Sequence, residues 1–278
     1  MSVFLAVILG IGYFISYYYQ NPRILYIAII FSLAMNIASY WYSDKITLSI
    51  SGAKEAKRAE YFDLYNDVEN LSITAGLPMP KVYVIEDVSP NAFATGRDKE
   101  HAVICVTTGL LRILNKNELE GVISHELSHI GNRDILLSTV VVVLVGSISI
   151  LANMFIRGRI FKGTDRDDRS GGVFQIIGIL FIILSPIIAT LIQLAISRKR
   201  EFLADASGAL LTRYPEGLAS ALQKISDAGI PMKSANPATA HLFIADPFAK
   251  TKQKVSTLFS THPPVALRIK ALLGNDKM

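Results

Sequence analysis

The residues best suited to chemistry lie in one stretch, His125-Glu126-Leu127-Ser128-His129. Positions i and i+4 of an α-helix share a face, so His125 and His129 can direct their imidazoles at one metal ion, with Glu126 beside them. This H-E-x-x-H spacing is typical of zinc peptidases, in which the histidines bind the metal and the glutamate is the general base. Two histidines on a helix can also be a simple surface pair. Apolar residues at intervals of three and four favour a buried site helix and hence a metal site: Leu119, Val122, Ile123, Leu127 and Ile130.

A catalytic zinc site usually has three protein ligands and one open position, so this stretch needs a further ligand. Asp134 is close in sequence, but it stands at the start of an apolar run. Glu201 and Asp205 are better candidates, because from one helix face Glu201 can bind the metal while Asp205 accepts a hydrogen bond from the outer nitrogen of a ligand histidine. Taken alone, this segment would be interpreted as a solvated helix face. Together with the H-E-x-x-H stretch, the metal-site interpretation of this segment is favoured.

The chain is unusually apolar: 51% of its 278 residues are hydrophobic, and the mean hydropathy is +0.37. Four runs contain no Asp, Glu, Lys or Arg, and each could cross a hydrocarbon core of about 30 Å as a helix: Ser2–Gln20, Ile24–Ser43, Ile135–Ile156 and Val173–Ser197. The last two runs could instead form a buried hairpin of a soluble domain, but their length favours membrane spans. A hairpin would return Glu201 to the neighbourhood of His129.

The first run lacks a basic leading region and ends in tyrosines, so we interpret it as a retained anchor and not as a cleaved signal peptide. More basic residues flank the spans on the side that carries the H-E-x-x-H stretch and both termini, which favours a cytoplasmic position for that side. The net charge of +5 is distributed beside the spans and forms no patch for nucleic acid. The single cysteine, Cys105, cannot form an internal disulfide and is expected to be a reduced core residue.

The polar portions of the chain alternate between strand and helix patterns. Strands are predicted over Lys45–Ser51, Lys81–Glu86, Asn91–Gly96 and His101–Thr108. Helices are predicted over Gly52–Leu71, from about Asn117 through the H-E-x-x-H stretch, and over Arg198–Leu211, Pro215–Ala228 and Pro264–Leu273. The short strand Asn91–Gly96 could be no more than a turn, or it could offer an edge to an extended peptide. The loop Lys162–Gly172 is interpreted as a solvated link.

The chain resembles the HtpX-type integral membrane zinc peptidases, which are related to the CAAX prenyl proteases. The resemblance covers nearly the whole chain and rests on these segments: Asn91–Gly96, Glu120–Ile130, Glu201–Asp205, Ala238–Ile244 and Leu258–Pro264 with Arg268. The implied fold class is α+β and mostly helical, with four transmembrane helices and a zincin-type, gluzincin-like catalytic domain that carries a small β-sheet. The implied organisation has four parts. Residues 1–43 form two transmembrane helices, and residues 44–134 form a first catalytic part with the H-E-x-x-H helix. Residues 135–197 form a transmembrane hairpin, and residues 198–278 form a second catalytic part with the third ligand.

The resemblance implies one Zn²⁺ per chain, bound by His125, His129 and Glu201, with Glu126 taking a proton from the nucleophilic water. It further implies that His262, with Arg268 nearby on the last helix, stabilises the oxyanion of the reaction. The alternative for His262 is an ordinary loop histidine.

Further roles are implied around these ligands. Asp205 and Arg268 would support the ligands, and Asn91 and Ala92 would hold substrate backbone. His241 also matches the family, but a structural role is preferred for it.

The expected function is therefore that of a zinc-dependent membrane endopeptidase. The residues predict the reaction, while the resemblance alone implies the substrates, which are misfolded or damaged membrane proteins on the cytoplasmic side, and a role in stress response and protein quality control. The implied partners are unfolded or membrane polypeptides and the lipid bilayer of the cell membrane, without nucleic acid. Two alternatives remain at this point: a CAAX prenyl-type protease, which usually has more spans, and a non-catalytic membrane scaffold with a zinc site, which would not need Glu126.

Overall fold

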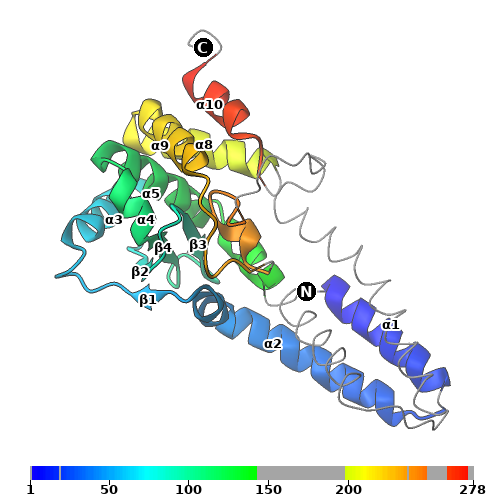
Figure 1. The fold of residues 1–278 in the computed structure, drawn as a ribbon. Coiled ribbons are helices and arrows are strands. Elements are labelled where there is room, and N and C mark those ends of the chain that lie inside the picture. Colours follow the sequence, from blue (N-terminus) through cyan, green and yellow to red (C-terminus); the bar gives the residue numbers. More distant parts are fainter. Residues whose placement is uncertain (1, 19, 143–197, 237, 249–261, 275–278) are drawn as a thin grey trace. The chain divides into compact units, whose positions relative to one another are not determined.

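The computed structural model describes residues 2–18, 20–142, 198–236, 238–248 and 262–274 (Figure 1). These residues fall into two compact units, one up to Tyr42 and one from Ser43 onward. The first unit contains the helix α1 (Ser2–Tyr18) and most of α2 (Arg23–Ser51). Within it, the two helices approach closely at Gly12, where a Cβ would lie 2.5 Å from Cβ of Ala28. The first two predicted apolar runs are therefore helical.

The predicted membrane spans are only partly within the described residues. Among these residues no single helix has the length and apolar character to cross a membrane, although one bent pair, Arg23–Ile37 with Tyr40–Ser51, meets the criterion by length and composition. The third predicted span starts as a helix over residues 134–142. Its remainder, the fourth span and the loop Lys162–Gly172 lie outside the described residues.

The prediction of a strand at Lys45–Ser51 is wrong, because α2 continues to Ser51. Its apolar residues alternate as in a strand, but the buried side chains of the segment follow helical spacing and include hydroxyl groups: Ser43, Thr47, Leu48 and Ser51. The alternation of apolar residues could not predict this helix, because polar hydroxyl side chains make up part of its buried face.

The second unit is built on a four-stranded sheet of order β1-β2-β4-β3. The strands are β1 (Lys54–Glu55), β2 (Lys81–Ile85), β3 (Ala92–Thr95) and β4 (Val103–Thr107). The strands β2 and β4 run parallel, whereas β1 pairs with β2 and β3 pairs with β4 in antiparallel fashion. This confirms the last three predicted strands, and β3 lies at the edge of the sheet.

The sheet is buried on both faces, and its side chains alternate between two apolar clusters. The larger cluster contains Val84, Ala94 and Ile104 together with residues of the helices α3 (Phe62–Ala75) and α5 (Lys116–Gly131). The smaller cluster contains Phe93 and Cys105 on the other face, and Cys105 is a free, buried cysteine as predicted. The helix predicted over Gly52–Leu71 is α3, which begins ten residues later than expected because β1 occupies the first part of that segment.

The helix α5 lies between the sheet and the helices α8 (Arg198–Thr212) and α9 (Pro215–Ala228), as Figure 1 shows. The short helix α4 (Thr108–Ile113) precedes α5, and a single 3₁₀ turn η1 (Ala240–Leu242) and the helix α10 (Val265–Leu273) complete the described elements of this unit. The predicted helices over Arg198–Leu211, Pro215–Ala228 and Pro264–Leu273 are thus confirmed.

Local chemistry fixes the start of α5. Asn115 caps the helix through a capping box with Glu118, which satisfies two backbone N–H groups at the helix start. Glu118 also accepts hydrogen bonds from Ser220 and Lys224 of α9. At Gly121 a Cβ would lie 2.7 Å from the backbone nitrogen of Leu218, so only glycine allows α9 to approach this closely. These contacts hold the helix that carries the candidate ligands.

Candidate active site and metal centre

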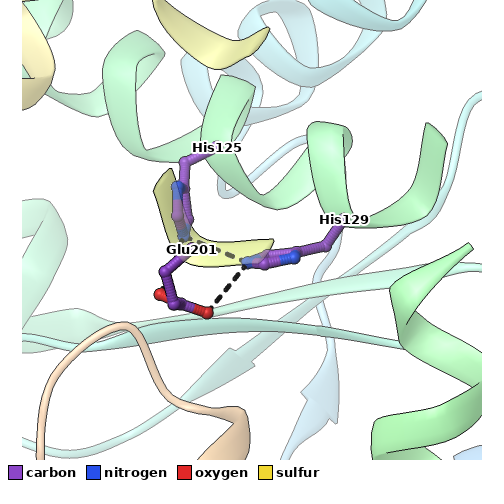
Figure 2. A group of neighbouring side chains, drawn as sticks. All are labelled: His125, His129 and Glu201. Atoms are coloured by element: carbon purple, nitrogen blue, oxygen red, sulfur yellow. Dashed lines mark hydrogen bonds and ion pairs between the residues drawn. The ribbon is translucent and has the colours of Figure 1, made fainter. Parts of the chain in front are cut away.

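Three of the predicted site residues come together as a group that could hold a metal ion. His125 and His129 project from α5, and Glu201 projects from the first turn of α8, so that one ligand atom of each lies within 4.8 Å of the others (Figure 2). Nε2 of His129 is 3.2 Å from Nε2 of His125 and 3.6 Å from Oε1 of Glu201. Nε2 of His125 is 3.9 Å from Oε2 of Glu201. Glu126 is adjacent and 2% exposed.

This arrangement fits a zinc ion. Zinc–nitrogen and zinc–oxygen bonds of about 2.0–2.2 Å at tetrahedral angles separate neighbouring ligand atoms by roughly 3.3–3.6 Å. The two nitrogens at 3.2 Å are close to that edge length, and each has one oxygen of Glu201 nearby, Oε1 at 3.6 Å for His129 and Oε2 at 3.9 Å for His125. Two histidines and a glutamate, with one position left open, are also a ligand set that catalytic zinc sites use.

The outer nitrogen of His125 is bound by Asp205, as the sequence predicted. Nδ1 of His125 lies 3.0 Å from Oδ1 of Asp205. Arg268 of α10 holds the same carboxylate through two hydrogen bonds of 2.8 and 2.6 Å and is itself fully buried. The guanidinium of Arg268 thus lies behind the ligands, against Asp205 and the ring of His125.

The outer nitrogen of His129 is bound by Asp134, a contact that the sequence analysis did not predict. Nδ1 of His129 lies 3.1 Å from Oδ2 of Asp134, and Arg200 binds the other oxygen of this carboxylate. From the sequence, the only role that Asp134 suggests is that of a metal ligand. Its position as an Asp directly before an apolar run, where a helix commonly begins, was a usable signal for a break after α5.

The charges around the ligands move their pKa values in opposite directions. Burial lowers the pKa of His125 to about 4, and the charges of Arg268 and His129 add to this while Asp205 opposes it. Burial would also lower the pKa of His129, but the hydrogen bond to Asp134 and the charge of Glu201 raise it to about 9. A metal ion that binds here must therefore displace a proton from His129 near neutral pH.

The pKa values of two carboxyl groups in the same cavity, those of Glu126 and Glu201, are also shifted. Burial raises the pKa of Glu126 to about 7, with a contribution from the charge of Glu201, while His129, Arg268 and a hydrogen bond from the backbone of Ala94 oppose the rise. Burial would raise the pKa of Glu201 as well, but the charges of His262, His129 and Arg268 hold it well below its usual range. Glu201 is thus an anion suited to a cation, and Glu126 can exchange a proton near neutral pH.

His262 and His241 line the same cavity as the ligands. This cavity has a volume of about 30 Å³, the scale of one water molecule, and Ala94, Leu242 and Ile244 form part of its wall. Nδ1 of His262 lies 3.0 Å from Oε2 of Glu201. His241 is buried and its Nε2 lies 3.1 Å from the carbonyl oxygen of Ser138, in keeping with the structural role preferred for it. Arg268 is not part of the cavity wall.

The chain itself engages Asn91 and Ala92, which were expected to hold substrate backbone. The side-chain amide of Asn91 donates to the carbonyl of Ala245 at 3.0 Å and accepts from its N–H at 3.2 Å. The carbonyl of Ala92 accepts from the N–H of Ile244 at 2.9 Å. Sequence patterns could not reveal this, because the partners lie about 150 residues away. Ala94, two residues along the edge strand, is the residue of β3 that lines the cavity.

Comparisons with known proteins identify peptidases as relatives of this chain. The model of peptidase family M48 matches residues 59–276. A protease HtpX homolog of Thermococcus kodakarensis is 50% identical over 275 residues, which cover 98% of this chain and 92% of that protein. A protease HtpX homolog of Caldanaerobacter subterraneus subsp. tengcongensis is 46% identical over 277 residues, which cover 97% and 91% of the two chains.

A solved structure shares the fold. The crystal structure of S. mikatae Ste24p superimposes with a TM-score of 0.53 at 18% identity and covers 98% of this chain. The match spans 62% of the Ste24p chain, so this protein corresponds to less than two thirds of its length. The family match, the close relatives and the ligand geometry together lead to one conclusion. The chain belongs to peptidase family M48 and is a metallopeptidase of the HtpX type.

Proposed function

We propose that the chain is a zinc-dependent endopeptidase of the cell membrane. The observation that carries this proposal is the convergence of His125, His129 and Glu201, with ligand atoms within 4.8 Å of one another, in a cavity that the buried Glu126 also lines. Zinc held by these three residues would lower the pKa of a water molecule to about 7 and polarise the scissile carbonyl group. The mixed chemistry of the ligands, two neutral nitrogens and one anion, supports zinc over magnesium or calcium, which prefer oxygen ligands.

Glu126 is assigned as the general base. It lies one position from the first ligand histidine, and burial brings its pKa to about 7, so it can accept a proton from the attacking water and pass it to the leaving amine. A bound cation would lower this pKa and keep Glu126 ionised as the reaction begins. A purely structural zinc site would not need a carboxylate in this position.

His262 is assigned to the oxyanion that forms on the scissile carbonyl. It lines the cavity with the ligands, and its Nδ1 lies 3.0 Å from Oε2 of Glu201, a contact that would hold its ring in the cavity wall. Arg268 is assigned a supporting role, because its guanidinium is buried behind the ligands where it neutralises Asp205. Asp205 in turn would orient His125 toward the metal.

The substrate is assigned as an extended polypeptide that lies along β3. An edge strand can bind a peptide through its backbone groups, and Ala94, whose backbone donates to Glu126 in this structure, brings this edge to the cavity wall. Ala92 and Asn91 would bind a peptide only if the residues around Ile244 moved away from them. The apolar helices α1 and α2 and the relatedness to HtpX-type proteases support a membrane location, with misfolded or damaged membrane proteins as substrates on the cytoplasmic side.

The test is cleavage of an unfolded protein by the detergent-purified, zinc-loaded chain beside two variants. Glu126→Gln should retain one zinc per chain and lose activity by about 10²–10⁴-fold, the usual contribution of a general base. Glu201→Ala should lose zinc as well as activity. Equal cleavage by the unmodified chain and Glu126→Gln would refute the assigned mechanism, and equal zinc content in Glu201→Ala would remove Glu201 from the ligand set.

A further inference from the structure

The outer nitrogen of His129 is held by a residue that follows it by only five positions. Nδ1 of His129 lies 3.1 Å from Oδ2 of Asp134, whose side chain is buried. In a continuous α-helix, residues five positions apart point about 140° away from each other and could not meet in this way. The contact exists because the helix is interrupted: Arg133 has a φ of +61°, and a new helical segment begins at Asp134.

The conformation of Arg133 is unfavourable for a residue with a long side chain. Left-handed backbone at a non-glycine residue persists only where the surrounding structure imposes it, and such residues cluster at functional sites. Here the turn brings the carboxylate of Asp134 within hydrogen-bonding distance of Nδ1 of His129.

The second oxygen of Asp134 is bound by Arg200. Nη1 of Arg200 donates to Oδ1 of Asp134, and Arg200 directly precedes Glu201 in the first turn of α8. One carboxylate therefore connects the end of the helix that carries His129 with the start of the helix that carries Glu201. The guanidinium is partly exposed, so this ion pair is reachable by solvent on one side.

We propose that Asp134 is a positioning residue for the metal centre and that Arg200 supports it, an inference that rests on the proposed function. Asp134 accepts the Nδ1–H of His129, which fixes the tautomer with a free lone pair on Nε2 and fixes the rotation of the ring toward the metal. Asp205 has the same relation to His125. Each ligand histidine thus has its own carboxylate, supplied from a different element.

A purely structural role for Asp134 would be to join two helices. Loss of the carboxylate would reduce stability under either role, so stability alone does not distinguish them. Only a positioning role predicts a weaker metal site, because outer partners of metal-binding histidines typically contribute 10–100-fold to metal affinity. The zinc dissociation constant is therefore the decisive measurement.

The experiment uses the full chain, purified in detergent and stripped of metal, with zinc affinity measured at pH 7.5 by competition with a chromophoric chelator. Asp134→Ala should bind zinc about 10–100-fold more weakly than the unmodified chain. Asp134→Asn keeps an oxygen that can accept the Nδ1–H but loses the charge, so its affinity should lie between the two. The absorption spectrum of the Co²⁺-loaded chain should also change in Asp134→Ala, because it reports ligand geometry.

The matched control is Glu118→Gln. Glu118 is a buried carboxylate of the same helix, and its partners are Asn115, Ser220 and Lys224 and no ligand residue. This variant should lower the melting temperature of the metal-free chain and leave its zinc affinity unchanged. Arg200→Met should weaken zinc by about 2–5-fold, the effect of a partly exposed ion pair, and should cause no further loss when Asp134 is already alanine.

Zinc affinity that does not change in Asp134→Ala, together with a lower melting temperature, would overturn the positioning role and leave a structural one. If Arg200→Met weakened zinc equally with and without Asp134, the supporting role of Arg200 would be overturned. Absence of zinc binding by the unmodified chain would be a different failure, because it would overturn the metal centre itself and this role with it.

Discussion

Asp67 and Asp205 are both buried carboxylates on helices that pack against α5, yet their pKa values move in opposite directions. Burial raises the pKa of Asp67 on α3 to about 6, and the charges of Glu120 and Asp63 add to the rise. Burial acts on Asp205 as well, but hydrogen bonds and charges from Arg268 and His125 lower its pKa to about 2. The desolvation of both groups is similar in kind, so the partners decide the outcome.

The partners differ in reach and exposure. Arg268 is 0% exposed and contacts both oxygens of Asp205. The cation nearest to Asp67 is Lys116, which is 73% exposed and 3.9 Å from Oδ1. A partner that is itself excluded from water keeps its attraction unscreened, whereas an exposed lysine does not. Asp205 is thus kept as a buried anion beside His125, while burial leaves the carboxylate of Asp67 on α3 harder to ionise.

The two carboxylates should contribute to stability with opposite pH dependence. The lowered pKa of Asp205 gives stability that is complete above its unfolded-state value near 4 and is lost as the pH falls toward about 2. The raised pKa of Asp67 gives stability that is complete below about 4 and is lost as the pH rises through about 6. At pH 7.5 the ionised Asp67 therefore opposes folding.

The largest effect is expected from Arg268→Met, which removes the partner that distinguishes Asp205. It leaves an uncompensated buried charge, so we expect the chain to lose about 3–5 kcal/mol of stability at pH 7.5. The measurement is the unfolding midpoint of the detergent-purified, metal-free chain in denaturant. Methionine keeps much of the volume of the arginine stem, so the loss reports charge more than packing.

Arg58→Met is the control for this variant, because Arg58 and Glu69 form an exposed pair at 2.6 Å. Its loss should stay below about 1 kcal/mol, as is usual for surface ion pairs. If the two variants lost equal stability, burial of the partner would not be the deciding difference between the two aspartates.

A smaller effect of opposite sign is expected from Asp67→Asn. The substitution removes an ionised group that opposes folding at pH 7.5, so stability should increase by about 1–3 kcal/mol, estimated from 1.36 kcal/mol for each pKa unit. The gain should disappear near pH 4, where Asp67 is largely protonated in the folded chain. Unfolding midpoints of both proteins between pH 4 and 8 provide the measurement.

Asp63→Asn serves as its control, since Asp63 is an exposed aspartate of the same helix. This change should shift stability by no more than about 0.5 kcal/mol at any pH in that range. A gain in Asp67→Asn that persisted unchanged at pH 4 would mean that a contact of the asparagine, and not the titration of the aspartate, is responsible.

The sequence predicted those parts of the site that depend on local spacing. His125, Glu126 and His129 follow from the geometry of one helix, and the strands β2, β3 and β4 follow from short apolar runs between turns. Spacing alone does not pair Glu201 and Asp205 with these histidines. That prediction also used the chemistry of zinc sites, which need a third metal ligand and a hydrogen-bond acceptor for the outer nitrogen of a ligand histidine. The structure brings both carboxylates to the expected histidines.

What could not be predicted depends on chain reversal and on contacts between distant segments. The turn that brings Asp134 to His129 includes Gly131, but its left-handed residue is Arg133, and arginine does not mark this backbone conformation. The occupation of the β3 edge by Ile244 joins segments about 150 residues apart. The Asp before an apolar run indicates a break after α5, but the partner of neither contact has a local pattern that could be recognised in the sequence.

The smallest effect is expected from Lys116→Met, which tests the weak partner directly. Nζ of Lys116 lies 3.9 Å from both Asp67 and Glu120, and an exposed pair of this kind contributes about 0.2–1 kcal/mol. Lys116 is also the first residue of α5, where a cation opposes the helix dipole, so the net loss at pH 7.5 should lie at the low end of that range. In an Asp67→Asn background the loss should shrink further. A loss of stability comparable to that of Arg268→Met would show that an exposed cation at this distance stabilises a buried carboxylate as much as a buried cation does. The opposite pKa shifts of the two aspartates would then need another cause.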